Sequence, residues 1–137
     1  MNANSNNTNN SNSQPQSGIA ANTQNQNALM LQQIIKKLSD MFGGRDYKKV
    51  YELATKIFKE NTTNMEILRY KMKSEEELGK IEDALRTANM MLMIQPFNME
   101  CHQTKIRLLK KLQKFNELSD SLVATKILFP QLTLNQD

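Results

Sequence analysis

The sequence contains few of the residues on which covalently or metal-stabilised folds depend. In 137 residues it has one cysteine, Cys101, one histidine, His102, and no tryptophan. A single cysteine excludes an internal disulfide framework and a cysteine-based zinc finger. A single histidine excludes a metal site built on two imidazoles. We therefore expect no metal and no cofactor, and a fold that rests on apolar packing.

Long hydrophobic runs are also absent. Hydrophobic residues make up 39% of the chain, but no stretch of 18 uncharged apolar residues exists, which excludes a predicted membrane-spanning helix. The first residues lack the basic and apolar segments of a secretory signal. With so little cysteine, the economical prediction is a reducing compartment, cytoplasmic or nuclear, and no membrane partner.

Charge is missing from the first part of the chain. Residues 1–35 contain no Lys, Arg, Asp or Glu, and most of segment 1–27 is Asn, Gln, Ser or Thr. Such a segment cannot bury enough apolar area to offset its ordering entropy, so we predict a disordered leader over 1–27. The folded domain is expected over 28–132, followed by a short tail at 133–137. The formal net charge of +4 is too small to indicate nucleic acid by itself.

Beyond residue 27 the apolar residues recur at spacings of three and four, which predicts amphipathic helices. No segment alternates at period two for long enough to predict a strand. The predicted helices are 28–42, 46–60, 65–78, 81–94, 99–112 and 115–128.

Residues that start or stop helices mark these boundaries. Gly43-Gly44 and Gly79 can adopt the left-handed conformation that closes a helix. Thr63 has capping-box spacing to a glutamate three residues on, and Asn98 is a good N-cap.

The six predicted helices form three pairs related by a 34-residue shift. Tyr47, Ile81 and Phe115 occupy the same position in successive pairs. The same register relates Val50, Ala84 and Leu118; Ala54, Ala88 and Leu122; and Thr62, Pro96 and Pro130. A helix–turn–helix period of this length indicates a solenoid rather than a globular bundle.

With this repeat the sequence resembles the tetratricopeptide repeat (TPR) family, most clearly over residues 79–98. Gly79, Ala84 and Pro96 occupy that family's turn glycine, small second-helix residue and closing proline. The resemblance implies an all-α, right-handed helix–turn–helix solenoid of three repeats. They lie near 31–64, 65–98 and 99–132.

One departure from the family pattern bears on packing. A family leucine of the first helix is lysine in all three copies, Lys37, Lys71 and Lys105. Buried unpaired lysines are improbable, so we expect a slightly rotated helix or stems that reach outward to water.

No set of residues assembles an active site. Ser119 and Asp120 lack a third group to orient them, and Cys101 and His102 are adjacent in sequence rather than converging across a turn. We expect both Cys101 and His102 to have packing roles. The methionines Met90, Met91 and Met93 are interpreted as core filling. The prediction is a protein without enzymatic activity.

In the resembled family the first helices line a concave groove that holds extended peptides. Carrying the groove positions over selects more basic than acidic side chains. Glu66 and Glu100 lie in first helical turns, where the macrodipole offsets part of their charge. A cationic groove would favour an acidic segment or a terminal carboxylate. The predicted partner contacts are Arg69, Tyr70, Lys73, Arg107, Lys110 and Lys111.

The chaperone-binding members of that family hold a terminal carboxylate with Lys, Asn and Arg side chains. None of the matching positions agrees here, so the resemblance predicts no such clamp. These positions are Ile35, Ser39, Tyr70, Glu100 and Thr104.

The last predicted helix has no helix after it to cover it. Only seven residues follow Pro130, too few for the polar capping helix that usually finishes such an array. We therefore expect Val123, Ile127 and Phe129 to form a possible end contact. This contact would make a homodimer or dock the chain on a larger partner.

These observations predict a non-catalytic adaptor or small assembly subunit that binds a protein. The alternative is an RNA-associated helical-repeat factor that uses the basic cluster Arg107, Lys110, Lys111 and Lys114 for phosphate contacts. Against RNA, only Tyr70 offers a ring for base stacking in the groove.

Overall fold

The computed structural model describes residues 25–132. Within that range the chain forms six helices and no strand, so the predicted all-α class is confirmed. Each predicted helix is present within the described range, and the observed ends from the end of the first helix onward differ from the predicted ones by two residues or fewer. The described part of the first helix covers 25–43, and the others are α2 (Tyr47–Phe58), α3 (Met65–Glu77), α4 (Ile81–Ile94), α5 (Met99–Lys111) and α6 (Phe115–Leu128).

The chain divides into two compact units, one that ends at Lys37 and one that begins at Leu38. The predicted leader lies outside the described residues as far as residue 24, as does the predicted tail at 133–137. Residues 25–27, which we assigned to the leader, are helical.

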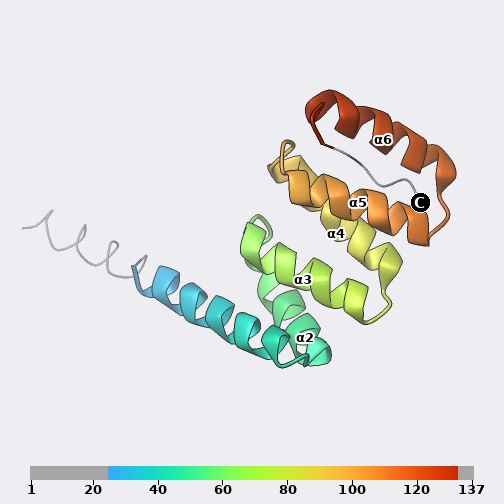
Figure 1. Cartoon of the computed structure of the whole chain (residues 1–137). Helices are drawn as coiled ribbons and strands as arrows, with labels where there is room; N and C mark the ends of the chain where they lie inside the picture. The colour runs from blue at the N-terminus through green and yellow to red at the C-terminus, as the bar shows by residue number, and fades with distance from the viewer. Residues whose placement is uncertain (1–24, 133–137) are drawn as a thin grey trace, which may run out of the picture. The chain divides into compact units, whose positions relative to one another are not determined.

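The helices of the second unit pack in series. Among α2 to α6, each helix packs against the one that follows it in the chain, as Figure 1 shows. Backbone packing in series, each helix on its chain neighbour, is the arrangement of a solenoid and differs from that of a closed bundle.

The turn inside each repeat uses one backbone geometry at three different residues. Arg45, Gly79 and Gln113 have positive φ of 62°, 79° and 58° and occupy the same position of the 34-residue repeat. After each of them the chain returns a Schellman-type hydrogen bond to the first helix. The three bonds are Asp46 N–H to Met41 O (2.9 Å), Lys80 N–H to Glu75 O (2.8 Å) and Lys114 N–H to Leu109 O (3.1 Å).

One predicted closing position is therefore wrong. In the first repeat the left-handed residue is Arg45, and Gly43 and Gly44 are not in that conformation. The 34-residue register explains the shift, because position 45 is the one that corresponds to Gly79.

Asparagine caps two first helices in the same way. The side chains of Asn64 and Asn98 accept hydrogen bonds at 3.1 Å from the backbone N–H groups of Ile67 and Cys101. The Asn98 cap is confirmed, whereas the predicted capping box at Thr63 is wrong by one residue. Because α3 begins at Met65, its glutamate falls at the second helical position and cannot complete the box.

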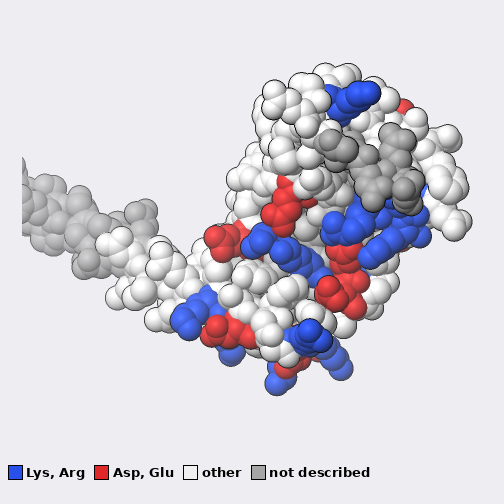
Figure 2. All heavy atoms as spheres, in the orientation of Figure 1, with Lys and Arg blue, Asp and Glu red and all other residues white. Residues whose placement is uncertain are grey.

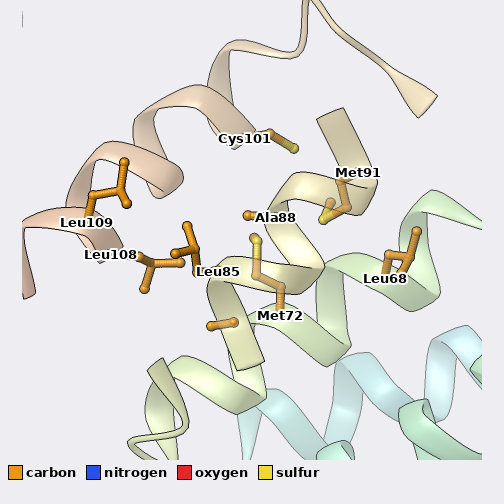
Figure 3. Close-up of a cluster of buried hydrophobic side chains, with 9 residues drawn as sticks. Leu68, Met72, Leu85, Ala88, Met91, Cys101, Leu108 and Leu109 are labelled. Carbon is orange, nitrogen blue, oxygen red and sulfur yellow. The ribbon is translucent and has the colours of Figure 1, made fainter. Parts of the chain in front are cut away.

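The buried core of the second unit lies around α4. Figure 3 shows Leu85, Ala88 and Met91 of α4 between side chains of α3 and α5. Met91 is buried as predicted, but Met93 is 83% exposed, so its interpretation as core filling is wrong. The full cluster is Leu68, Met72, Ala84, Leu85, Ala88, Met91, Cys101, Leu108 and Leu109.

A polar network crosses from α3 to α4 beside this core. Glu75 is 1% exposed, and its carboxylate lies 2.7 Å from Lys71 Nζ and accepts a 2.7 Å hydrogen bond from the hydroxyl of Thr87. Lys71 Nζ also lies 5.4 Å from the centroid of the Phe58 ring. Lys71 is thus paired inside the fold with a buried carboxylate, and it does not need to reach bulk water.

Candidate functional site

The residues predicted to contact a partner lie on two neighbouring first helices. Arg69, Tyr70 and Lys73 belong to α3, and Arg107, Lys110 and Lys111 to α5. Figure 2 shows basic and acidic side chains side by side over these two helices. We call this surface, together with Glu76 and Glu100, the α3–α5 face.

Glu76 is the centre of the strongest ionic contact on this face. Arg107 donates from Nε and Nη2 to the two carboxylate oxygens at 2.9 and 2.8 Å, and Lys111 Nζ donates at 3.0 Å. The bidentate hydrogen bonds of Arg107 lower the pKa of Glu76 from 4.5 to about 2, with Lys111 adding to the effect against the opposing influence of burial. The same contact raises the pKa of Arg107.

Glu100 makes a looser pair of contacts. Arg69 Nε donates to Glu100 at 3.4 Å, and Lys73 Nζ lies 3.7 Å from the same oxygen. All three side chains are partly open to solvent, where ion pairs contribute about 0–1 kcal/mol.

The spacing of these pairs follows from the repeat. Arg69–Glu100 and Arg107–Glu76 both join residues 31 positions apart. That separation is three residues, about one helical turn, shorter than the 34-residue period. Each pair therefore joins a residue of one first helix to a residue that lies one turn before its counterpart in the next first helix. Sequence reasoning discounted Glu100, although a search for opposite charges at this spacing would have found both pairs.

Four basic side chains on the α3–α5 face therefore meet two carboxylates. Arg69, Lys73, Arg107 and Lys111 outnumber Glu76 and Glu100. The exposed Glu66, which lines the same hollow as Arg69 and Glu100, reduces this positive surplus but does not cancel it. The sixth predicted residue, Lys110, lies half-buried in the last turn of α5.

Tyr70 belongs to a small group of rings beside these charges. Its ring centroid lies 6.0 Å from that of Phe42, which in turn lies 5.2 Å from that of Tyr47. Lys73 Nζ lies 5.9 Å from the Phe42 centroid. Phe42 is one of the groove positions carried over from the resembled family, but it was not among the six predicted partner contacts.

A small hollow of about 120 Å³ lies between the start of α3 and the start of α5. Arg69 and Glu100 line it, and Cys101 forms part of its wall. Burial, with a smaller effect of Glu100, raises the pKa of the Cys101 thiol, which disfavours the nucleophilic thiolate. Within residues 25–132 no group of three or more His, Cys, Asp and Glu side chains is placed to hold a metal ion.

His102 packs at the edge of the array. Its ring centroid lies 5.7 Å from that of Phe129, and Nε2 lies 2.7 Å from the carbonyl oxygen of Pro96. Nε2–H is the donor in this contact, since a carbonyl oxygen can only accept.

The residues predicted for an end contact differ in exposure. Val123 and Ile127 are exposed, whereas Phe129 is half-buried against His102. Thr125 is the one fully buried residue of α6, and this helix is covered on one side.

The basic cluster of the RNA alternative is partly neutralised. Besides the pairing of Arg107 and Lys111 with Glu76, Lys114 Nζ lies 3.4 Å from a carboxylate oxygen of Glu82.

None of the helices within 25–132 has the length and apolar character needed to cross a membrane.

Comparison with known proteins supports the fold. No family model matches the chain, and no curated protein matches it. The chain is similar to the solved Arabidopsis OM64 TPR domain, with 17% identity and a TM-score of 0.63 over 73% of this chain and 83% of that one. It is also similar to a chain in a structure of Naa15/Naa10 bound to HypK-THB, with 20% identity and a TM-score of 0.49 over 72% of this chain and 15% of that one.

Proposed function

We propose that this array, which has the fold of a TPR domain, is a non-catalytic protein–protein interaction module. In this proposal the chain is a cytoplasmic or nuclear adaptor, or a small assembly subunit. Its α3–α5 face holds an acidic segment of a partner, without the terminal-carboxylate clamp of chaperone-binding arrays.

The observation that carries the proposal is the positive surplus on the α3–α5 face. The guanidinium of Arg69 has five N–H donors and gives one of them, at 3.4 Å, to a half-exposed carboxylate. The remaining donors, with Lys73 beside them, suit a carboxylate from a partner. Arg107 and Lys111 are held more tightly by Glu76, so we expect Arg69 and Lys73 to make the first contacts.

The fold favours such binding because the donors are already positioned. Arg69 and Lys73 lie one turn apart on α3, which is fixed by its Asn64 cap and by the buried network with α4. Little side-chain and backbone ordering then opposes association. The rings of Phe42 and Tyr70 offer apolar contact next to the charges.

A titration of the full chain with a fluorescently labelled 12-residue peptide of alternating Glu and Gly tests the proposal. The charge reversal Arg69→Glu with Lys73→Glu should weaken binding at least tenfold, measured by fluorescence anisotropy. The matched control is Lys48→Glu with Lys56→Glu, which makes the same change of charge at exposed positions of α2. Equal weakening by both double variants would show a nonspecific charge effect and contradict the proposal.

The RNA alternative predicts a different result in the same assay. A labelled single-stranded RNA would bind more tightly than the acidic peptide, with an affinity that falls steeply with salt. Substituting Lys110→Glu with Lys114→Glu would then weaken the RNA complex most. This pattern would replace the protein-binding proposal.

A further inference from the structure

A second exposed surface lies where the second helices of repeats two and three end. Met93 and Ile94 close α4, Phe97 follows in the turn, and Ile127 and Leu128 close α6. Met93, Phe97 and Ile127 are 83%, 73% and 74% exposed. We call these five residues, with the turns that carry them, the turn edge.

The turn edge follows the repeat register. Met93 corresponds to Ile127 and Ile94 to Leu128 in the 34-residue period. In the first repeat the same two positions are Lys59 and Glu60. The fold therefore does not require an apolar residue at these positions, and their exposure in two successive repeats needs another reason.

The two parts of the turn edge are joined at His102. Its Nε2 lies 2.7 Å from Pro96 O in one turn, and its ring lies 5.7 Å from the ring of Phe129 in the other. Figure 1 shows the end of α4 and the end of α6 at the same edge of the stack. Between the turns is a hollow of about 410 Å³, lined by Met99, Phe129, Pro130, Gln131 and Leu132.

The turn edge carries no charge. Residues 93–99 and 127–132 contain no Lys, Arg, Asp or Glu, in contrast to the α3–α5 face. An uncharged surface of this kind matches an uncharged apolar surface, since a charged group placed on it would lose its water without gaining a partner.

We propose that the turn edge docks one amphipathic helix of a partner protein through that helix's apolar stripe. A helix presents apolar side chains at spacings of three, four and seven residues, about 10 Å for the last of these. One such side chain can enter the hollow while its neighbours cover Met93 or Ile127. The unbranched thioethers of Met93 and Met99 can adapt to the incoming side chains.

The size of the surface favours a helix over a second copy of this chain. A few large side chains that are one-third to four-fifths exposed offer on the order of 500 Å². A stable dimer generally buries about 800 Å² on each partner. The turn edge falls short of that area but is sufficient for a single helical segment.

The test uses the full chain and a labelled 18-residue helical peptide with Leu at spacings of three and four and Gln elsewhere, so that no charge contributes. The wild-type chain should bind it with a micromolar dissociation constant by fluorescence anisotropy. Phe97→Ser with Ile127→Ser should weaken binding at least tenfold. The matched control, Phe115→Ser with Leu29→Ser, removes two exposed apolar residues outside the turn edge, at the start of α6 and in the first helix, and should change binding less than twofold.

All variants should keep the wild-type helicity by circular dichroism, as expected for substitutions at exposed positions. No binding by the wild-type chain, or equal weakening by both double variants, would overturn the proposal. Binding of the wild-type chain to neutral phosphatidylcholine vesicles would also overturn it if Phe97→Ser with Ile127→Ser abolished that binding. The turn edge would then be a lipid-binding surface. A wild-type dimer by light scattering that the same variant converts to a monomer would overturn it in favour of self-association.

Discussion

Three left-handed residues set the bend between the helices of each repeat. Their φ angles lie within about 20° of one another, at 62°, 79° and 58°, although one is arginine, one glycine and one glutamine. A side chain in this conformation carries strain that glycine avoids, about 1–2 kcal/mol. The first and third turns are therefore held in place by the packing of the helices on either side.

Substitutions at two of these positions should have opposite effects. Gln113→Gly should raise the free energy of unfolding by about 0.5–1 kcal/mol, because glycine adopts positive φ without strain. Gly79→Ala should lower it by about 1 kcal/mol, and no atom within 4 Å would meet the added Cβ, so backbone strain alone is responsible. Urea denaturation measures both, and a change of the same sign in the two variants would contradict this account.

The ion pairs of Glu76 should make stability depend on pH. Its pKa is lowered from 4.5 to about 2, so the stabilisation is present above pH 4.5 and is lost as the pH falls toward 2. Because Arg107 and Lys111 are half-exposed, we discount the full shift and expect about 1–2 kcal/mol. Glu76→Gln should lose this amount at pH 7 and little at pH 2.

Thermal unfolding of both chains between pH 2 and 7 measures the difference. Asp120→Asn, which removes an exposed carboxylate of α6, is the control and should leave the pH profile unchanged. A constant gap between wild-type and Glu76→Gln across this range would show that the carboxylate does not act through its charge.

At the residue scale the sequence predicts types better than exact positions. Asn98 and Gly79 were identified correctly because an asparagine side chain is a preferred helix N-cap and glycine adopts positive φ without strain. Arg45 was missed because the packing of the repeat imposes its left-handed conformation. Arginine is not a residue type that predicts positive φ. Met93 was misplaced because methionine suits both a core and an exposed apolar surface.

At the scale of the helical elements, the buried network holds α3 to α4. Glu75 occupies the position that is Leu109 in the next repeat, where the side chain is fully buried in the core. A carboxylate in this place requires Lys71 and Thr87 as partners, because an unpaired buried charge is strongly destabilising. Lys71 and Glu75 are four residues apart on one helix, so their pairing was readable from the sequence. The burial of the carboxylate and its hydrogen bond from Thr87 of α4 were not.

Removing one side of this pair should cost more than removing both. Lys71→Met leaves the buried carboxylate without its cation and should lower the free energy of unfolding by about 3 kcal/mol. Lys71→Met with Glu75→Leu restores an apolar contact like that of the next repeat and should recover most of the loss. Urea denaturation of the single and double variants measures the coupling, and additive losses would contradict a paired role.

The observed helix boundaries were predictable to within two residues because apolar periodicity is joined by a local signal at a helix end. Gly79 marks the joint between α3 and α4, and Asn98 marks the joint between α4 and α5. Side-chain contacts between helices were not predictable in the same way. The pairs at 31 residues become visible when the register of the stack is known.

At the scale of the whole second unit, stability is built from neighbour contacts. Each of α2 to α5 packs on the next helix, so α3, α4 and α5 have two neighbours in this series and α6 has one within the described residues. In such an array the terminal elements open with a lower free energy than the centre.

Native-state hydrogen exchange should show this gradient. We expect amides of α6 to exchange faster than those of α3, α4 and α5, by at least tenfold at neutral pH, because Thr125 is the one fully buried residue of α6. The core cluster lies across the three inner helices, so we expect their amides to exchange slowly and through a shared opening of all three helices. Equal protection in α6 and α4 would indicate that the described helices unfold as one unit.

The whole-molecule prediction of a solenoid succeeded because the 34-residue period is repeated three times in register. The two surfaces that we propose as partner contacts were not equally open to prediction. The charged face followed from carrying over the positions of a known family, whereas the turn edge required the exposure of Met93, Phe97 and Ile127.

The three bends of the stack reach the same dihedral angles with three unrelated residues, and this has an evolutionary consequence. A lineage that keeps its curvature through neighbouring helices can lose the glycine at one joint after another. Repeats that descend from one ancestral hairpin would then diverge in sequence until their pairwise identity is very low, while their backbones remain superimposable.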